Sequence, residues 1–360
     1  MTKSEVLTRP LLDAAPQCVG YQLASPPCGG GKSLLTSKLA HARRILLTFA
    51  TVAAVLSLAS CSNNDDPAEP NLGSAPVVVS VALDTTMTHF TTYDTESRTG
   101  GQPVLRLQVQ AIADKDHRVL ARETRLIRPG QPLGGEVRFT LPSGKHHLLA
   151  WADYVADSAT PTDLYYRTAD LTDISFMGST YVGDNDHRNA YAATAPVEFK
   201  VYEGDTTTVI HSDLSLKSIM GKLRFVATDY NEWLSKAQPL RVLVSYTGFL
   251  PNRYSVLRGV PFDSTTGISF LTSMRDGSTE SGTVTLAEDL VMVNGDESSV
   301  QVAMGLYDDD GQLVTRTQTL TVPLRRGGIT TVTGHFLTKT SSAGGIGIDP
   351  SFGGDINVYY

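Results

Sequence analysis

The sequence predicts an all-β protein with two antiparallel β-sandwich domains. The chain has 360 residues, 41% of them hydrophobic, which is enough to bury the cores of about two domains. Only 19% of the residues are charged, while Thr, Ser, Val and Gly are plentiful, and this composition favours strands over helices. Apolar and polar residues alternate over strand-length runs that are bounded by Gly, Pro, Asp and Asn. Such regular spacing is typical of antiparallel sandwiches.

Charge separates the N-terminal end from the rest of the chain. Residues 1–60 carry six Lys and Arg against two acidic residues, which leaves 24 basic and 35 acidic residues from position 61 onward, a net charge of −11. An acidic body without a basic stripe argues against nucleic acid as a partner and against docking on anionic lipid. Any attachment to a membrane must therefore be apolar.

Residues 45–60 form an uncharged, apolar run that follows Arg43 and Arg44. This pattern predicts a signal peptide, and its 16 residues are short for a spanning helix, which needs about 20. The sequence Leu-Ala-Ser-Cys at 58–61 resembles a bacterial lipobox, which implies cleavage before Cys61 and acylation of its thiol. The alternative is a buried helix that ends in an unmodified cysteine.

The segment before this signal peptide does not look like a targeting element. Signal peptides start close to the first residue, so we interpret residues 1–34 as a misassigned translation start. Cys18 and Cys28 lie in this leader, and the mature chain would keep Cys61 alone. We therefore expect neither a disulfide framework nor a cysteine-based metal site.

The mature chain divides into four predicted parts. Residues 61–75 are a polar, flexible tether, 76–215 an N-terminal β-sandwich, 216–340 a C-terminal β-sandwich, and 341–360 a flexible segment that ends in a candidate strand. The strands expected in the first sandwich are 76–83, 104–112, 136–141, 146–154, 196–202 and 206–214. The strands expected in the second are 221–228, 240–246, 282–286, 299–307, 313–322 and 329–337. A short helix is expected within 229–237, and 156–195 is the longest span without clear strands.

No motif for catalysis is present. The sequence has neither a GxSxG elbow, nor HExxH, nor an evident pair of catalytic carboxylates, so we expect no enzyme activity, no catalytic residues and no cofactor. Residues 184–189 begin like a calcium loop, but Asn189 stands where the turn needs Gly and no Glu closes the motif. We interpret this segment as a solvated turn and expect no metal site.

Aromatic residues are concentrated between positions 151 and 191. They are Trp151, Tyr154, Tyr165, Tyr166, Tyr181 and Tyr191. Aromatic faces stack on sugar rings, so Tyr165, Tyr166 and Tyr181 are candidate glycan contacts. Trp151 is expected in the first core, and the alternative for the tyrosines is that they only support the long loop.

Several features together resemble the fimbrillin-like lipoproteins of the Bacteroidetes. They are the lipobox, the acidic tether, Arg98 before the second strand, the pair Trp151-Ala152, the polar run 185–191, the strand 222–229 and the ending 344–360. The resemblance spans nearly the whole mature chain. It implies two transthyretin-like β-sandwiches, a lipid anchor in the outer membrane through acylated Cys61, and exposure at the cell surface, where Asp65 and Asp66 look like an export signal.

The resemblance also implies a mode of assembly. Polymerising members of this family are cut after an Arg, lose their first strand and accept a donor strand from another subunit. Arg98 is the candidate processing site here, and the alternative is an ordinary surface arginine. Ile356, Val358 and Tyr360 share one face of a C-terminal candidate donor strand by their period of two, although this strand can also pair within its own sandwich.

The sequence thus favours a fimbrial (pilus) subunit with a structural, anchor or tip role in adhesion. Its expected partners are outer-membrane lipid, other fimbrial subunits or further copies of itself, and surface glycans or proteins, but no nucleic acid. The alternative is a monomeric glycan-binding surface lipoprotein that uses the aromatic loop and does not need Arg98. An enzyme is the third choice.

Overall fold

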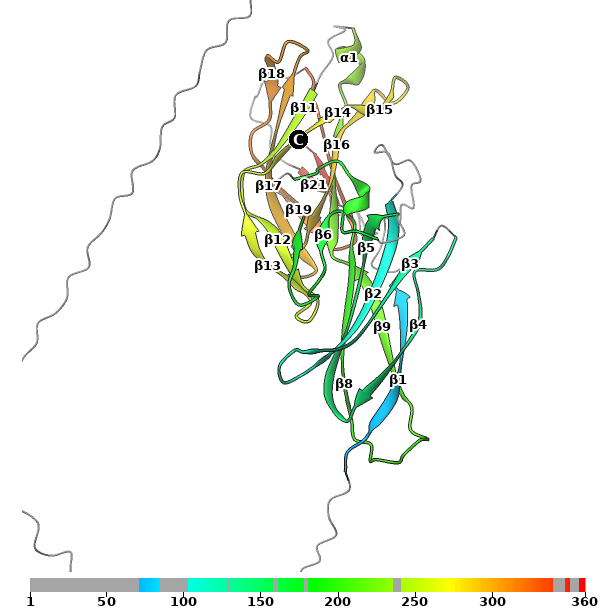
Figure 1. Ribbon diagram of the computed structural model, residues 1–360. Helices are drawn as coiled ribbons and strands as arrows, with labels where there is room; N and C mark the ends of the chain where they lie inside the picture. The colour runs from blue at the N-terminus through cyan, green and yellow to red at the C-terminus, as the bar shows by residue number, and fades with distance from the viewer. Residues whose placement is uncertain are drawn as a thin grey trace, which may run out of the picture. The chain divides into compact units, whose positions relative to one another are not determined.

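The computed structural model describes most of the chain from residue 71 onward (Figure 1). The described residues are 71–84, 103–128, 130–157, 161–177, 181–235, 241–338, 347–349 and 356–359. All of them belong to one compact unit, Glu69–Tyr360. Nearly every element is a strand, and among the described residues no helix has the length and apolar character needed to cross a membrane.

A seven-stranded sheet is formed by the N-terminal half of this unit, in the order β3-β2-β5-β8-β9-β1-β4. Its strands are β1 (Ser74–Leu83), β2 (Pro103–Ala113), β3 (Val119–Ile127), β4 (Gly134–Pro142), β5 (Gly144–Ala156), β8 (Tyr191–Phe199) and β9 (Ile210–Ser218). Strands from both ends of this order contribute side chains to one core, including Val79, Leu107, Phe139 and Leu148. The sheet therefore folds over itself as a β-sandwich.

Two further sheets enclose the C-terminal core. One has the order β15-β16-β10-β20-β22-β21 and the other β14-β11-β17-β18, with β19 paired to β17. Their strands are β10 (Met220–Ala227), β11 (Arg241–Tyr246), β14 (Ser269–Ser273), β15 (Arg275–Ser278), β16 (Thr283–Met292), β17 (Glu297–Tyr307), β18 (Leu313–Arg316), β19 (Leu320–Arg325), β20 (Ile329–Gly334), β21 (Gly347–Asp349) and β22 (Ile356–Tyr359). Phe225, Val244, Leu286 and Val302 are buried between them.

A small four-stranded sheet joins segments from both halves, in the order β13-β12-β7-β6. It consists of β6 (Tyr166–Arg167) and β7 (Ile174–Phe176) with β12 (Leu250–Ser255) and β13 (Val260–Thr265). A third core lies against it and contains Trp151, Tyr166, Tyr254 and Met220. The long segment after β5 is thus anchored to the C-terminal strands.

The predicted fold class is confirmed, with two refinements. Three strand pairs are parallel, β1 with β9, β10 with β20 and β20 with β22, while the other pairs are antiparallel. Several strands were not expected from the sequence, among them β3 and the meander β12–β14. β3 is an edge strand that carries Arg122, Glu123 and Arg125, and these charges hide its period of two.

The other expectations about the fold have mixed outcomes. Trp151 is fully buried as expected, although it lies in the third core beside the long segment. The expected helix is α1 (Tyr230–Leu234), a little over one turn. The predicted boundary at residues 215–216 falls inside β9, and the division into two domains stays a prediction.

Candidate functional site

Strand β1 lies between β4 and β9, with β4 antiparallel and β9 parallel to it (Figure 1). Its backbone pairs with β4 along 74–82 and with β9 along 77–83. Val77, Val79 and Val81 alternate into the core and are at most 4% exposed. Full burial of one such side chain contributes about 1.5–3 kcal/mol. β1 therefore fills a slot that has a hydrogen-bonding backbone on both sides and an apolar floor.

The backbones of β1 and β4 approach each other closely at Gly134. This residue has φ +140°, and a Cβ there would lie 2.2 Å from the carbonyl oxygen of Val81. Only glycine satisfies both the backbone angle and the space. Any other residue at position 134 would therefore push the backbones of β1 and β4 apart at this end of the slot.

The chain is already fixed before β1 begins. The amide of Gly73 donates to the carbonyl of Val201 at 2.8 Å, and the amide of Glu203 donates to the carbonyl of Asn71 at 2.9 Å. These contacts tie the start of the described chain to the connection between β8 and β9.

Two residues singled out from the sequence, Cys61 and Arg98, lie outside the described residues. β1 ends at Leu83 and β2 begins at Pro103, so Arg98 belongs to the connection between these two strands. A cut after Arg98 would leave β1 attached to the fold only through non-covalent contacts.

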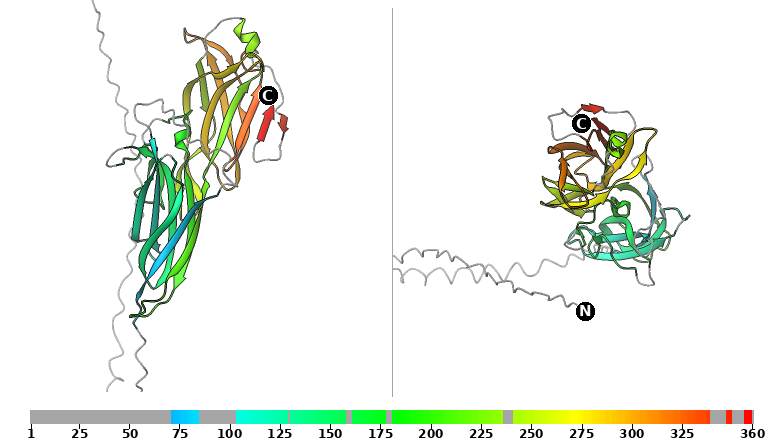
Figure 2. Two further views of the ribbon diagram at one scale, coloured as in Figure 1. Left: turned by 90° about the vertical axis from the view of Figure 1, so that its right-hand side faces the viewer. Right: turned by 90° about the horizontal axis from the view of Figure 1, so that it is seen from above.

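The C-terminal strand β22 pairs in parallel with β20 of its own chain, and β21 pairs with its other side (Figure 2). Val358 is 1% exposed and Ile356 packs partly buried against the same core. Tyr360 lies outside the described residues. The candidate donor strand thus pairs within its own sheet, as the alternative interpretation expected. Exchange of this strand between subunits stays a prediction.

A buried group of charges holds the long segment after β5 against strands β2 and β5. Arg106 donates to both carboxylate oxygens of Asp153, at 2.9 and 2.8 Å, and its Nη1 donates to Asp163 at 2.7 Å. Burial raises the pKa of Asp153 to about 6, although Arg106 opposes this shift. The ion pair orients the chain where it leaves β5.

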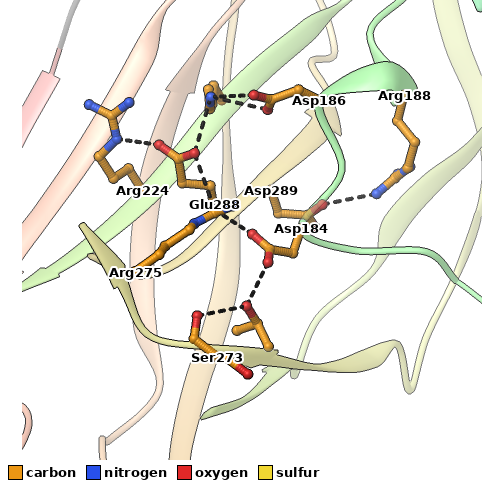
Figure 3. Close-up of polar contacts among 10 residues, drawn as sticks. Asp184, Asp186, Arg188, Arg224, Ser273, Arg275, Glu288 and Asp289 are labelled. Carbon is orange, nitrogen blue, oxygen red and sulfur yellow. Dashed lines mark hydrogen bonds and ion pairs between the residues drawn. The ribbon is translucent and has the colours of Figure 1, made fainter. Parts of the chain in front are cut away.

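A second buried pair joins the same segment to the C-terminal strands. Nη1 of Arg188 donates to Asp289 on β16 at 2.9 Å, and both side chains are 2% exposed (Figure 3). The hydroxyls of Tyr181 and Tyr246 donate to the other oxygen of Asp289, at 2.8 and 2.7 Å. Burial raises the pKa of Asp289, and Arg188 and the two tyrosines oppose that shift. The arrangement satisfies a carboxylate that would otherwise be costly to bury.

The motif that begins like a calcium loop is neutralised by the protein's own cations (Figure 3). Asp186 pairs with Lys222 at 3.1 Å, and Asp184 pairs with Arg275. Lys222 and Arg275 also reach Glu288, at 3.3 and 3.2 Å. The expectation of a solvated turn was therefore incomplete, since Asp184 is only 13% exposed. The described residues contain no group of His, Cys, Asp and Glu arranged for a metal ion.

The three candidate glycan contacts are separated by the fold. Tyr165 and Tyr181 line one cavity of about 560 Å³. Tyr166 is fully buried beside Trp151, its hydroxyl donates to the carbonyl of Arg188, and it does not line this cavity. Tyr166 supports the segment from within, as the alternative interpretation expected.

Sequence reasoning missed the residues that organise this region, above all Arg188, Asp289 and Lys222. Arg188 and Asp289 are 101 positions apart, so no local spacing connects them. Asp289 and Lys222 each stand next to a leucine, but Arg188 lies in the polar run 184–189, and neither pattern identifies a partner.

Comparisons with known proteins give one family and a set of solved structures. The model of a family described as "Family of unknown function (DUF6562)" matches residues 71–359. A search of curated proteins finds no match. The solved structures with similar chains include a fimbrial assembly protein from Parabacteroides distasonis, with 10% identity and a TM-score of 0.37 over 73% of this chain and 90% of that one.

Three of these structures illustrate the degree of similarity. A proposed polysaccharide-binding protein from Bacteroides thetaiotaomicron has 14% identity and a TM-score of 0.43, over 67% of this chain and 79% of that one. A proposed adhesin from Bacteroides ovatus has 12% identity and a TM-score of 0.43, over 68% and 77%. The fimbrial anchor protein Mfa2 from Porphyromonas gingivalis has 15% identity and a TM-score of 0.39, over 68% and 81%.

Proposed function

The chain belongs to the family of unknown function DUF6562, and we propose that it is a cell-surface fimbrial subunit with a structural, anchor or tip role in adhesion. Its assembly is triggered by a proteolytic cut that releases strand β1. The observation that carries this proposal is the position of β1 between β4 and β9, followed by a connection that contains Arg98. The resemblance to fimbrillin-like lipoproteins supplies the rest of the scheme.

Loss of β1 would leave a groove that demands a replacement. The groove would expose unpaired backbone groups of β4 and β9 and the apolar floor now covered by Val77, Val79 and Val81. Uncovered apolar surface costs about 25 cal/mol for each Å², and unpaired backbone invites another strand. A donor strand from a second subunit would restore both kinds of contact.

The donor in this proposal is the C-terminal strand. β22 follows residues 339–355, which include Gly344 and Gly345. Among the described strands, β20 and β21 are the ones that pair with it. Ile356 and Val358 face the core of their own chain, and the same side chains would enter the groove of a neighbour.

Attachment to the outer membrane is proposed to be through the acylated thiol of Cys61. Nine residues, 62–70, would then join the lipidated Cys61 to the first contact of the fold, at Asn71. A fully extended chain of this length spans about 35 Å, so the tether holds the sandwich close to the membrane before processing.

The experiment compares two substitutions at Arg98 in a Bacteroides-type host that carries an arginine-specific surface protease. Arg98→Lys keeps the charge and Arg98→Ala removes it, but both remove the arginine that such a protease requires. We expect both variants to lose the ladder of high-mass species seen on gels without boiling. The matched control is Arg118→Lys, an exposed arginine in the turn before β3, which should leave the ladder unchanged. Ladders of normal intensity from Arg98→Lys and Arg98→Ala would refute processing at this position.

The alternative, a glycan-binding lipoprotein, is supported by one observation, the cavity that Tyr165 and Tyr181 share. Glycan binding and fimbrial assembly are compatible, because the cavity and the β1 slot use different residues.

A further inference from the structure

The cavity of about 560 Å³ lies beside the four-stranded sheet and is lined by residues of the long segment and of the C-terminal strands. Its volume is within the usual range for small-molecule sites, roughly 300–1,000 Å³. Three arginines line it, Arg167, Arg188 and Arg253, and none of the described lining residues is acidic. In a chain with net charge −7, this concentration of cations favours an anionic ligand.

Not all three guanidinium groups are available to a ligand. Arg253 is already paired with Asp173. Arg167 is exposed and forms no ion pair with any described residue. Arg188 uses Nη1 to donate to Val182 and Asp289, while its buried Nη2 has no partner among the described residues. Arg167 and Arg188 therefore retain donors that a carboxylate can accept from.

A second unsatisfied group points to the rest of the ligand. Oδ1 of Asn252, another lining residue, is buried and accepts no hydrogen bond within the described chain. Buried polar atoms are usually paired with protein, water or ligand, so this acceptor and the donor of Arg188 are the groups that a ligand in the cavity would satisfy. A simple anion such as phosphate satisfies the arginine but brings no apolar surface, whereas a hydroxylated ring with a carboxylate satisfies both atoms.

The remaining walls suit a sugar ring. Phe176 and Tyr181 lie with ring centroids 6.2 Å apart at 66°, and both line the cavity with Tyr165 and Ile268. Arg188 packs over the same two rings, 5.1 Å from the centroid of Phe176 and 4.0 Å from that of Tyr181. Aromatic and aliphatic walls pack against the C–H faces of pyranose rings while a few polar groups fix the orientation.

We infer that this cavity binds a uronic acid residue of a surface polysaccharide. Its carboxylate accepts hydrogen bonds from Arg167 and from Nη2 of Arg188, a ring hydroxyl donates to Oδ1 of Asn252, and the ring packs on Phe176 and Tyr181. This inference rests on the proposed surface role for its setting, but binding is measured on the purified chain and does not depend on ladder formation. A failure of uronate binding is therefore distinguishable from a failure of the proposed fimbrial assembly.

The test is calorimetric or NMR titration of the purified full chain with D-glucuronate and D-galacturonate. D-glucose and D-galactose are the neutral controls, and inorganic phosphate is the anion control. We expect at least one uronate to bind at least tenfold more tightly than its neutral counterpart and than phosphate, and its binding to weaken as salt is raised.

Two variants assign the binding to this cavity. Arg167→Gln changes an exposed side chain and should weaken uronate binding at least tenfold without changing the unfolding transition. Arg258→Gln, an exposed arginine that packs on Phe262 and does not line the cavity, is the matched control and should bind as the parent does. Absence of binding by both uronates, equal binding of a uronate and its neutral sugar or phosphate, or an unchanged affinity in Arg167→Gln would each overturn the inference.

Discussion

The guanidinium of Arg188 lies 2.9 Å from the carboxylate of Asp289, and each of these side chains is 2% exposed. Arg188 ends the single-turn helix η2 (Asp186–Arg188) in the long segment after β5, while Asp289 belongs to β16. The pair therefore ties the segment that carries the proposed ligand cavity to a strand of the C-terminal core.

Removal of one partner should be costly. Arg188→Met leaves Asp289 buried without its cation, and we expect the free energy of unfolding to fall by about 3–5 kcal/mol. Urea denaturation measures this loss. The control is Arg325→Met, which breaks an exposed pair with Glu297 and should cost no more than about 1 kcal/mol. Losses of similar size in the two variants would contradict the structural role of the buried pair.

Asp153 should make stability depend on pH. Its pKa in the folded chain is raised from 3.8 to about 6, so the folded state binds more protons than the unfolded state between these values. The stabilisation that protonated Asp153 gives to the folded state is fully present below about pH 4 and is lost as the pH rises through 6. A shift of about two units corresponds to about 3 kcal/mol.

This pH dependence is measured as the difference in unfolding free energy between the parent and Asp153→Asn. Between pH 4 and pH 7 the parent should lose about 3 kcal/mol of unfolding free energy relative to Asp153→Asn, because Asn does not titrate. A constant difference across this pH range would show that burial does not raise the pKa of Asp153.

The contact between β1 and β4 can be probed at Gly134. Gly134→Ala places a Cβ 2.2 Å from the carbonyl oxygen of Val81, whereas Gly130→Ala meets nothing within 4 Å although Gly130 also has positive φ. Both variants place a Cβ at positive φ, +84° at Gly130 and +140° at Gly134, and only Gly134→Ala adds the clash. We expect Gly134→Ala to be less stable than Gly130→Ala by about 1–3 kcal/mol in thermal or urea unfolding. Equal stability would mean that β1 and β4 are not packed as described.

Much of the fold was predictable because most strands carry their own local signal. The alternating valines of β1 and the hydrophobic run of β2 mark core strands directly. β3 and β12 were missed because an edge position and polar residues such as Asn252 and Arg253 mask the alternation. The parallel pairing of β1 with β9 was also not predictable, since residues about 130 positions apart share no local pattern.

The region of the cavity was predictable only in part. The clustering of aromatic residues indicated a feature between positions 151 and 191, but it did not separate Tyr166, which is buried, from Tyr165 and Tyr181, which line the cavity. That distinction depends on β12, which comes from the other half of the chain and pairs with β7 of the long segment. Tertiary contacts of this kind leave no trace in spacing or composition.

Deletion of residues 344–360 should separate folding from assembly. The deletion removes the buried side chain of Val358, so we expect a loss of about 1.5–3 kcal/mol but a folded chain. The deleted chain should form no ladder by itself. Mixed with processed parent subunits, it should shorten their ladders, because it keeps the groove but has no donor strand. Ladders formed by the deleted chain alone would place the donor elsewhere, and an unfolded product would assign β22 to the essential core.

The most direct measurement of the central proposal is the N-terminal residue of subunits in the assembled, high-mass material. Mass spectrometry of these species, purified from the cell surface, should find peptides that begin at Thr99 and none from 71–84, the segment that contains β1. The monomeric precursor from the same cells should retain these peptides. Assembled subunits in which residues 71–84 are still covalently joined to β2 would contradict assembly by loss of the first strand.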